Sequence, residues 1–168
     1  MKKITTILTM TTLSLMSLNA ANLSATFADD IWKKSAVPKS EVCSNFNTKA
    51  GSTPSINLVN IPANTDKIML TFSDETFWGM RDGGHGVVSY KVPANSTSLT
   101  IPAMQGETFT LPTGFTSEVK HRGEKFKKTP GAYLAPCSGG KGNTYSVVIK
   151  AMNKDKILDA TSLTLGIF

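Results

Sequence analysis

The stretch "PGAYLAPCSGGKGNTYSVVIKAM", residues 130–152, joins a glycine-rich turn to the clearest strand pattern in the chain. From Tyr145 to Ala151 every second residue is apolar, and Ser146 and Lys150 lie between them. Alternation with a period of two is typical of a strand with one buried face. The turn before this strand holds one of the two cysteines. It could bind a phosphate, present a reactive thiol or form one half of a disulfide.

Short alternating runs recur upstream, separated by Pro, Gly and Asn, at residues 68–72, 88–92, 99–101 and 109–111. This spacing predicts a mainly β fold, an antiparallel β-sandwich with few short helices, in a single domain spanning residues 29–168. The best helix candidate covers residues 155–161. Residues 29–54 are polar and aperiodic, which predicts an extended arm leading into the domain.

The bulk composition is that of one globular domain. The chain has 168 residues, 40% of them hydrophobic and 18% charged. The formal net charge is +6. An excess of this size favours anionic partners only weakly, and its dispersal along the chain gives no indication of nucleic-acid binding.

The N-terminus has the order of a secretory signal. Lys2 and Lys3 precede an uncharged apolar and Ser/Thr-rich run, and small residues follow it. We expect residues 1–28 to hold a signal peptide with cleavage between Ala20 and Ala28. The Lys-Lys start and the short apolar region suggest a bacterial protein that is periplasmic or secreted. The run is shorter than the roughly 20 residues that a membrane span needs, so no transmembrane anchor is expected.

Export would place the two cysteines, Cys43 and Cys137, outside the reducing cytoplasm. An oxidising compartment favours a disulfide between them. Because the bridge would close most of the chain into a loop, the chain-entropy model gives it a contribution on the order of 4–5 kcal/mol. A free, nucleophilic Cys137 is the alternative.

The glycine run at residues 138–142 lacks the spacing of a nucleotide-binding P-loop, and it leads into a strand where such a loop leads into a helix. The long segment 113–143 around it is basic. It carries Lys120, Arg122, Lys125, Lys127 and Lys128, and its acids are Glu118 and Glu124. This segment could attract an anion or an acidic partner, or it could be an ordinary solvated loop.

Titratable groups gather in "FSDETFWGMRDGGHG", residues 72–86. Asp74 and Glu75 end one strand pattern and His85 opens the next, so their side chains could converge on one pocket. Ordinary turn residues would give the same pattern. No nucleophile motif accompanies the two histidines, His85 and His121, and the sequence predicts no catalytic residue, metal site or cofactor.

Several stretches, taken in order, resemble the phosphatidylethanolamine-binding proteins (PEBP), in particular their bacterial Raf-kinase-inhibitor-like branch. Cys43 followed by "GSTPSINL" (51–58) is similar to that branch's Cys and Asn-x-Ser-Pro-x-Leu-x-Trp. The family's turn and strand, its histidine-led strand and its cysteine loop are matched by "IPANTDKIMLTF" (61–72), "HGVVSYKVPA" (85–94) and residues 131–152. The resemblance covers about residues 41–165 and implies a PEBP-like β-sandwich, divergent and shortened at its C-terminus.

The same resemblance implies a ligand pocket with altered polar residues. Where the family has Asp-Pro-Asp, this chain has Ser73, Asp74 and Glu75, and its pocket histidine corresponds to His85. The family's His-Arg-Tyr becomes Asn143-Thr144-Tyr145. The expected ligand-binding residues are Ser73, Asp74, Glu75, His85, Pro136, Asn143 and Tyr145.

Three functional hypotheses remain open on the sequence. The leading one is an exported binding module that holds a small polar or anionic ligand, of the phosphate or phospholipid head-group type, near His85 and Tyr145. The alternative is a periplasmic or secreted protein-interaction or inhibitor-like protein with a degenerate pocket and an unidentified protein partner. An enzyme would need a free Cys137 or an activated His85. The oligomeric state is not predicted.

Overall fold

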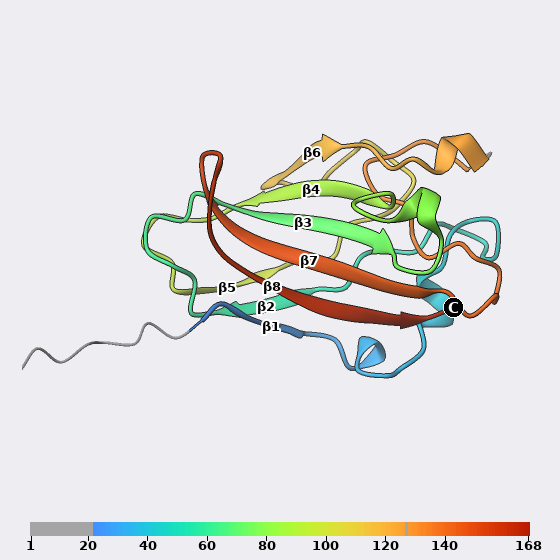
Figure 1. Ribbon diagram of the computed structural model, residues 1–168, viewed down its shortest axis with the longest axis horizontal. Helices are drawn as coiled ribbons and strands as arrows, with labels where there is room; N and C mark the ends of the chain where they lie inside the picture. The colour runs from blue at the N-terminus through green and yellow to red at the C-terminus, as the bar shows by residue number, and fades with distance from the viewer. Residues whose placement is uncertain (1–21, 127) are drawn as a thin grey trace, which may run out of the picture.

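The computed structural model describes residues 22–126 and 128–168, and two antiparallel sheets face each other in it (Figure 1). The larger sheet has the strand order β6-β4-β3-β7-β8 and the smaller the order β1-β2-β5. The strands are β1 (Ser24–Phe27), β2 (Ile56–Val59), β3 (Lys67–Asp74), β4 (Gly86–Lys91), β5 (Ser98–Ile101), β6 (Phe115–Val119), β7 (Thr144–Asn153) and β8 (Lys156–Ile167). The predicted mainly β sandwich is confirmed.

The alternating pattern that opened the sequence forms the centre of the larger sheet. In β7 Tyr145, Val147, Ile149 and Ala151 are buried, and β7 pairs with β3 along the whole length of β3. Each fully buried aliphatic side chain of this kind contributes about 1.5–3 kcal/mol. The core therefore lies between the two sheets, with β3 and β7 as its main wall.

Two local expectations were wrong. The helix expected at residues 155–161 belongs to β8, because this segment continues the hairpin from β7 and pairs with it from Lys156 onward. The run at 109–111 forms no named strand, and Phe109 is exposed. The edge strand is β6 instead, within the segment that looked like one long loop, because β4 offers its free edge to Phe115–Val119.

The arm expected at residues 29–54 does not extend away from the domain. Its few apolar residues, among them Trp32, Val37 and Val42, are buried in the core. Its helices are single 3-10 turns, η1 (Asp30–Trp32) and η2 (Lys39–Glu41), as are η3 (Trp78–Met80) and η4 (Gly123–Phe126) elsewhere in the chain. Apolar side chains spaced irregularly can still anchor a segment that has no regular structure.

A disulfide fixes the arm to the turn that precedes β7. Cys43 and Cys137 are bonded, with Cα atoms 5.3 Å apart, and the Cys43 N–H donates to the Pro136 carbonyl at 3.0 Å. The expected pairing of the two cysteines is confirmed, and Cys137 carries no free thiol. The expected signal peptide spans residues 1–28, and its first 21 residues lie outside the described part of the chain. Within the described ranges no helix is long and apolar enough to cross a membrane.

Candidate ligand-binding pocket

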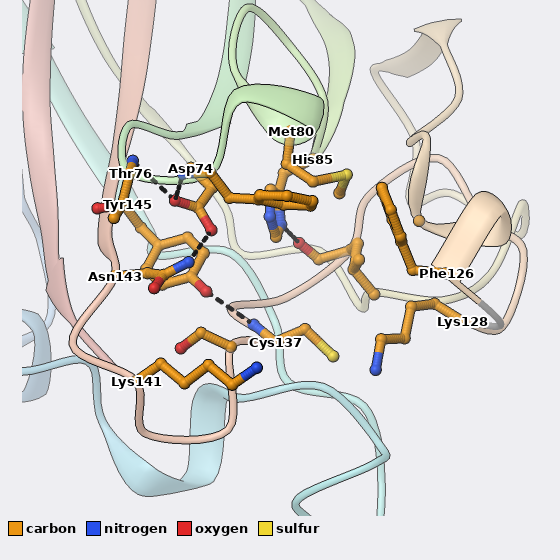
Figure 2. Close-up of a pocket in the computed structure, with 14 residues that line it drawn as sticks. Asp74, Thr76, Met80, His85, Phe126, Lys128, Cys137, Lys141, Asn143 and Tyr145 are labelled. Carbon is orange, nitrogen blue, oxygen red and sulfur yellow. Dashed lines mark hydrogen bonds between the residues drawn. The ribbon is translucent and has the colours of Figure 1, made fainter.

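A cavity of about 410 Å³ opens at one end of the sandwich, where β3 ends and β4 and β7 begin (Figure 2). The connections that carry η3 and η4 and the turn around Cys137 close its sides. The residues that line it are Asp74, Thr76, Phe77, Met80, His85, Gly123, Phe126, Lys128, Leu134, Cys137, Ser138, Lys141, Asn143 and Tyr145. One part of the wall is apolar, and the rest carries hydrogen-bonding groups.

Asp74 is the buried acid of the pocket. It follows Phe72 at a spacing of two, so the alternation along β3 places both on the core side of the sheet. Its Oδ1 accepts the Thr76 and Phe77 N–H groups, each at 2.9 Å, and its Oδ2 accepts Asn143 Nδ2 at 2.6 Å. The carboxylate thus orders the chain after β3 and ties it to the start of β7.

His85 is almost fully buried and lies with its ring edge against Tyr145, the ring centroids 5.2 Å apart. Its Nδ1 is 2.7 Å from the Leu134 carbonyl. Because a carbonyl can only accept, Nδ1 carries the proton and Nε2 keeps its lone pair. Burial lowers the pKa of His85 to about 4, so the ring is neutral at pH 7. Among the described residues Nε2 has no hydrogen-bond partner, which leaves it able to accept one.

Glycine next to the histidine lets the backbone of the 131–136 segment approach it. Gly86 has φ +114°, and a Cβ there would lie 2.0 Å from the Ala132 carbonyl oxygen. Only a residue without a side chain fits at this point. The close approach brings the Leu134 carbonyl to His85, so a local sequence feature, His-Gly at the start of β4, fixes the orientation of the imidazole.

Tyr145 contributes a second polar atom to the pocket. Its hydroxyl oxygen accepts the Cys137 N–H at 3.2 Å, which joins the strand to the disulfide turn. Burial raises the pKa of Tyr145 to about 12, so the hydroxyl is neutral and keeps a proton to donate. The pocket therefore offers an acceptor at His85 and a donor at Tyr145.

The lysines and the apolar side chains come from the long basic segment and from η3. Lys128 and Lys141 line the cavity, and neither forms an ion pair among the described residues. Phe77 contacts Phe126 edge to face at 5.1 Å between centroids. Asp74 supplies negative charge on one part of the pocket wall, and the two ammonium groups supply positive charge on another part (Figure 2).

His121 anchors the segment that carries Phe126 and Lys128. Its Nδ1 accepts the Gly123 N–H at 3.0 Å, and its Nε2 therefore donates to the Thr129 carbonyl at 2.9 Å. Burial lowers the pKa of this histidine, which keeps it neutral. The second histidine of the sequence thus organises the cavity wall and does not line it.

The cavity brings together four of the seven residues expected to bind a ligand: Asp74, His85, Asn143 and Tyr145. Ser73 and Pro136 lie behind His85 and Tyr145 around a narrow void with no room for water. The Ser73 hydroxyl accepts the Gly83 N–H at 3.1 Å. Glu75 is exposed and accepts a hydrogen bond from the Ser146 hydroxyl. Strand alternation explains why Asp74 lines the cavity while Ser73 and Glu75 do not, because residues 73 and 75 lie on the opposite face of the strand from residue 74.

The sequence reasoning missed the apolar wall and one of the lysines. Phe77, Met80 and Phe126 look like isolated loop residues in the sequence, and Lys141 was assigned only to a glycine-rich turn. The apolar run Phe77–Met80, which follows two acids and one threonine, was an available signal. Nothing local indicates that Phe126 lies against Phe77, because the contact joins segments far apart in the chain.

In the described part of the chain no group of three His, Cys, Asp or Glu side chains is arranged to hold a metal ion. No family model and no curated protein matches the sequence. Among solved structures, the fold is similar to that of Escherichia coli YbcL, described as a new member of the mammalian PEBP family. The TM-score is 0.58 at 19% identity, and the match covers 88% of this chain and 98% of that chain. The chain therefore has the PEBP fold.

Proposed function

We propose that the protein is an exported binding module, without catalytic activity, that holds a small polar or anionic ligand in the cavity beside His85 and Tyr145. The observation that carries the proposal is the combination, in one cavity, of a neutral imidazole acceptor, a phenol donor and two lysines that form no ion pair among the described residues. A concave, partly apolar site with a few convergent polar groups is the usual form of a small-molecule site.

The protonation states define which ligand groups are complementary to which parts of the pocket. His85 Nε2 and the Asp74 carboxylate favour a hydrogen-bond donor or a cationic group. Lys128 and Lys141 favour phosphate or carboxylate. A head group of the phosphoethanolamine type carries both, with its ammonium suited to the acidic part of the pocket and its phosphate to the lysines.

The test is a titration with O-phosphoethanolamine, followed by the side-chain ¹H–¹⁵N resonances of His85. We expect saturable shifts at His85 at millimolar ligand or below, and smaller shifts at His121, which does not line the cavity. Inorganic phosphate and ethanolamine, titrated separately, divide the affinity between the two charged groups. An unchanged His85 spectrum at millimolar ligand would exclude this function.

Two variants locate the binding. Lys141→Gln removes one ammonium from the cavity and should weaken phosphoethanolamine binding about three- to tenfold. Lys154→Gln removes a lysine from the turn between β7 and β8, far from the cavity, and should leave binding unchanged. Equal loss in both variants would indicate binding driven by net charge alone.

Export forms part of the proposal, and the disulfide supports it. Strand β1 lies inside the expected cleavage window and pairs with β2 from Ser24 to Phe27. Cleavage near Ala20 would keep this strand, whereas cleavage at Ala28 would remove it. We therefore expect the N-terminus of the secreted protein, measured by intact mass, to lie before Ser24. A mass corresponding to the uncleaved chain would contradict export through this signal.

A further inference from the structure

Three large aromatic side chains are exposed around the mouth of the cavity. The exposed fraction is 80% for Trp78, 50% for Phe46 and 41% for Phe126. They come from η3, from the arm after Cys43 and from η4, which lie at the same end of the sandwich (right in Figure 1). A tryptophan exposed to this degree in a short 3-10 turn contributes little to folding, so its position calls for another reason.

These side chains form one continuous feature. Phe77 links two of them, with its ring 6.0 Å from Trp78 and 5.1 Å from Phe126 between centroids. Lys128 links the third, because its Nζ lies 5.7 Å from the centre of the Phe46 ring. Lys128 and Phe126 both line the cavity, so the aromatic groups flank its opening.

Three lysines at this end form no ion pair among the described residues, and most of the nearby acids are hydrogen-bonded or ion-paired. Lys125, Lys128 and Lys141 form no ion pair among the described residues. Glu124 pairs with Lys120 at 2.9 Å. Of the other acids at this end, Glu107 is bonded to the Ser44 N–H at 2.8 Å and to its hydroxyl, Glu75 accepts the Ser146 hydroxyl, and Asp74 is buried in the cavity wall, whereas Asp82 after η3 is exposed. We define the aromatic–lysine rim as Phe46, Trp78, Lys125, Phe126, Lys128 and Lys141.

We propose that the aromatic–lysine rim docks on a membrane surface that carries anionic lipid head groups. Tryptophan and phenylalanine bury favourably in the boundary between head groups and acyl chains, and lysines are attracted to anionic lipids. The rim presents both kinds of side chain around the cavity mouth. Docking this way brings the cavity to the depth of the lipid head groups and does not depend on which ligand it holds.

The two tryptophans make the test direct. Trp32 is 2% exposed and reports on the fold, so a change in fluorescence on adding vesicles comes from Trp78. The mature chain is mixed with vesicles of phosphatidylcholine containing 30% phosphatidylglycerol, and with vesicles of phosphatidylcholine alone. We expect a blue shift, quenching by lipids brominated on the acyl chain, and co-sedimentation with the anionic vesicles only, all reduced by salt.

Matched variants distinguish binding through the aromatic–lysine rim from nonspecific adsorption to vesicles. Trp78→Ala should weaken vesicle binding about tenfold. Ile157→Ala removes an apolar side chain that is 50% exposed at the other end of the sandwich, and should have no effect. Lys125→Gln and Lys128→Gln should each weaken binding about fivefold, and Lys154→Gln should leave it unchanged. Both tryptophan and lysine effects are read by co-sedimentation, with circular dichroism as the check of folding.

Three outcomes would overturn the proposal. The first is the absence of a Trp78 shift and of co-sedimentation with anionic vesicles. The second is equal binding to neutral and anionic vesicles, because the lysines would then have no role. The third is a Trp78 shift that depends on protein concentration without vesicles, which would mean that a second copy of the chain covers the rim.

Discussion

The two ends of the sandwich are built from the same strands but differ in chemistry. At the cavity end, long connections cover buried polar groups, and three aromatic side chains and unpaired lysines surround the opening. At the other end, where β3 begins and β4 ends, a hollow of about 360 Å³ is lined by Asp66, Lys67, Ser89, Lys91, Gly114, Thr116, Glu118, Lys154 and Asp155. Its charged side chains are of both signs and are partly or fully exposed to solvent.

This difference between the two ends predicts where the loss of an interaction lowers the free energy of unfolding. At the far end Lys67 and Glu118 form an exposed pair at 3.5 Å, and Asp66 accepts the Lys154 N–H at 2.7 Å in a tight hairpin turn. Water can replace such partners at little cost. At the cavity end Asp74 and His85 are buried, so a hydrogen bond lost by either side chain leaves a polar group with little access to water. Perturbing the cavity end should therefore be costly, and equivalent changes at the far end should not.

The largest effect should come from the disulfide. Replacing both Cys43 and Cys137 by alanine frees a loop with a sequence separation of 94 residues. We expect the free energy of unfolding to fall by about 4–5 kcal/mol, measured by urea denaturation, because the unfolded chain regains that freedom. Adding reductant to the native protein should give the same result. A loss below about 1 kcal/mol would show that packing alone holds the arm in place.

Removal of the buried carboxylate should be next. Asp74→Ala leaves the N–H groups of Thr76 and Phe77 and the Asn143 amide without an acceptor, so the free energy of unfolding should fall by about 3 kcal/mol. Asp74→Asn keeps an oxygen for the backbone donors and should cost about 1 kcal/mol. Asp66→Ala, the exposed counterpart at the far end, should cost less than about 1 kcal/mol. Similar losses for both alanine variants would remove the distinction between the ends.

Acidic pH should act mainly on the cavity end, through His85. The folded-state pKa is lowered to about 4 and the unfolded value is 6.5, so the unfolded chain binds the proton more readily between these values. Stability is unaffected by His85 above about pH 7. It should decrease as the pH falls from 6.5 to 4, by about 3 kcal/mol in total.

His85→Gln should flatten this decrease, because glutamine does not titrate but can still donate to the Leu134 carbonyl. A smaller decrease of the same sign should remain from His121, whose pKa burial also lowers. The measurement is urea denaturation at half-unit steps of pH. An unchanged pH profile in the variant would mean that the imidazole is not buried as described.

The smallest effect belongs to the far end. Glu118→Gln breaks the pair with Lys67, in which each side chain is about 30% exposed, and should change the free energy of unfolding by less than about 0.5 kcal/mol. It should leave phosphoethanolamine and vesicle binding unaltered. A loss of either binding would show that the two ends are coupled through the sheet.

Much of the fold could be predicted because its signal is local. The period of two along β3 and β7 defines the core face, and the presence of only two cysteines behind an expected export signal favours their pairing. The same alternation explains why Asp74 lines the cavity and Glu75 does not. The helix expected at 155–161 was wrong because its residues have weak preferences, and pairing with β7 outweighs them.

The amino-acid sequence by itself determined strands β3, β4, β5 and β7, the disulfide partners and the polar residues at the ends of β3, β4 and β7, because periodicity and residue chemistry are properties of neighbouring positions. Only the tertiary structure decided that Phe77 contacts Phe126, that Lys128 and Lys141 line one cavity, and that Trp78 stays exposed beside it. These residues lie in connections without a repeating pattern. Their positions depend on which distant segments pack together and on how deeply His85 is buried between them.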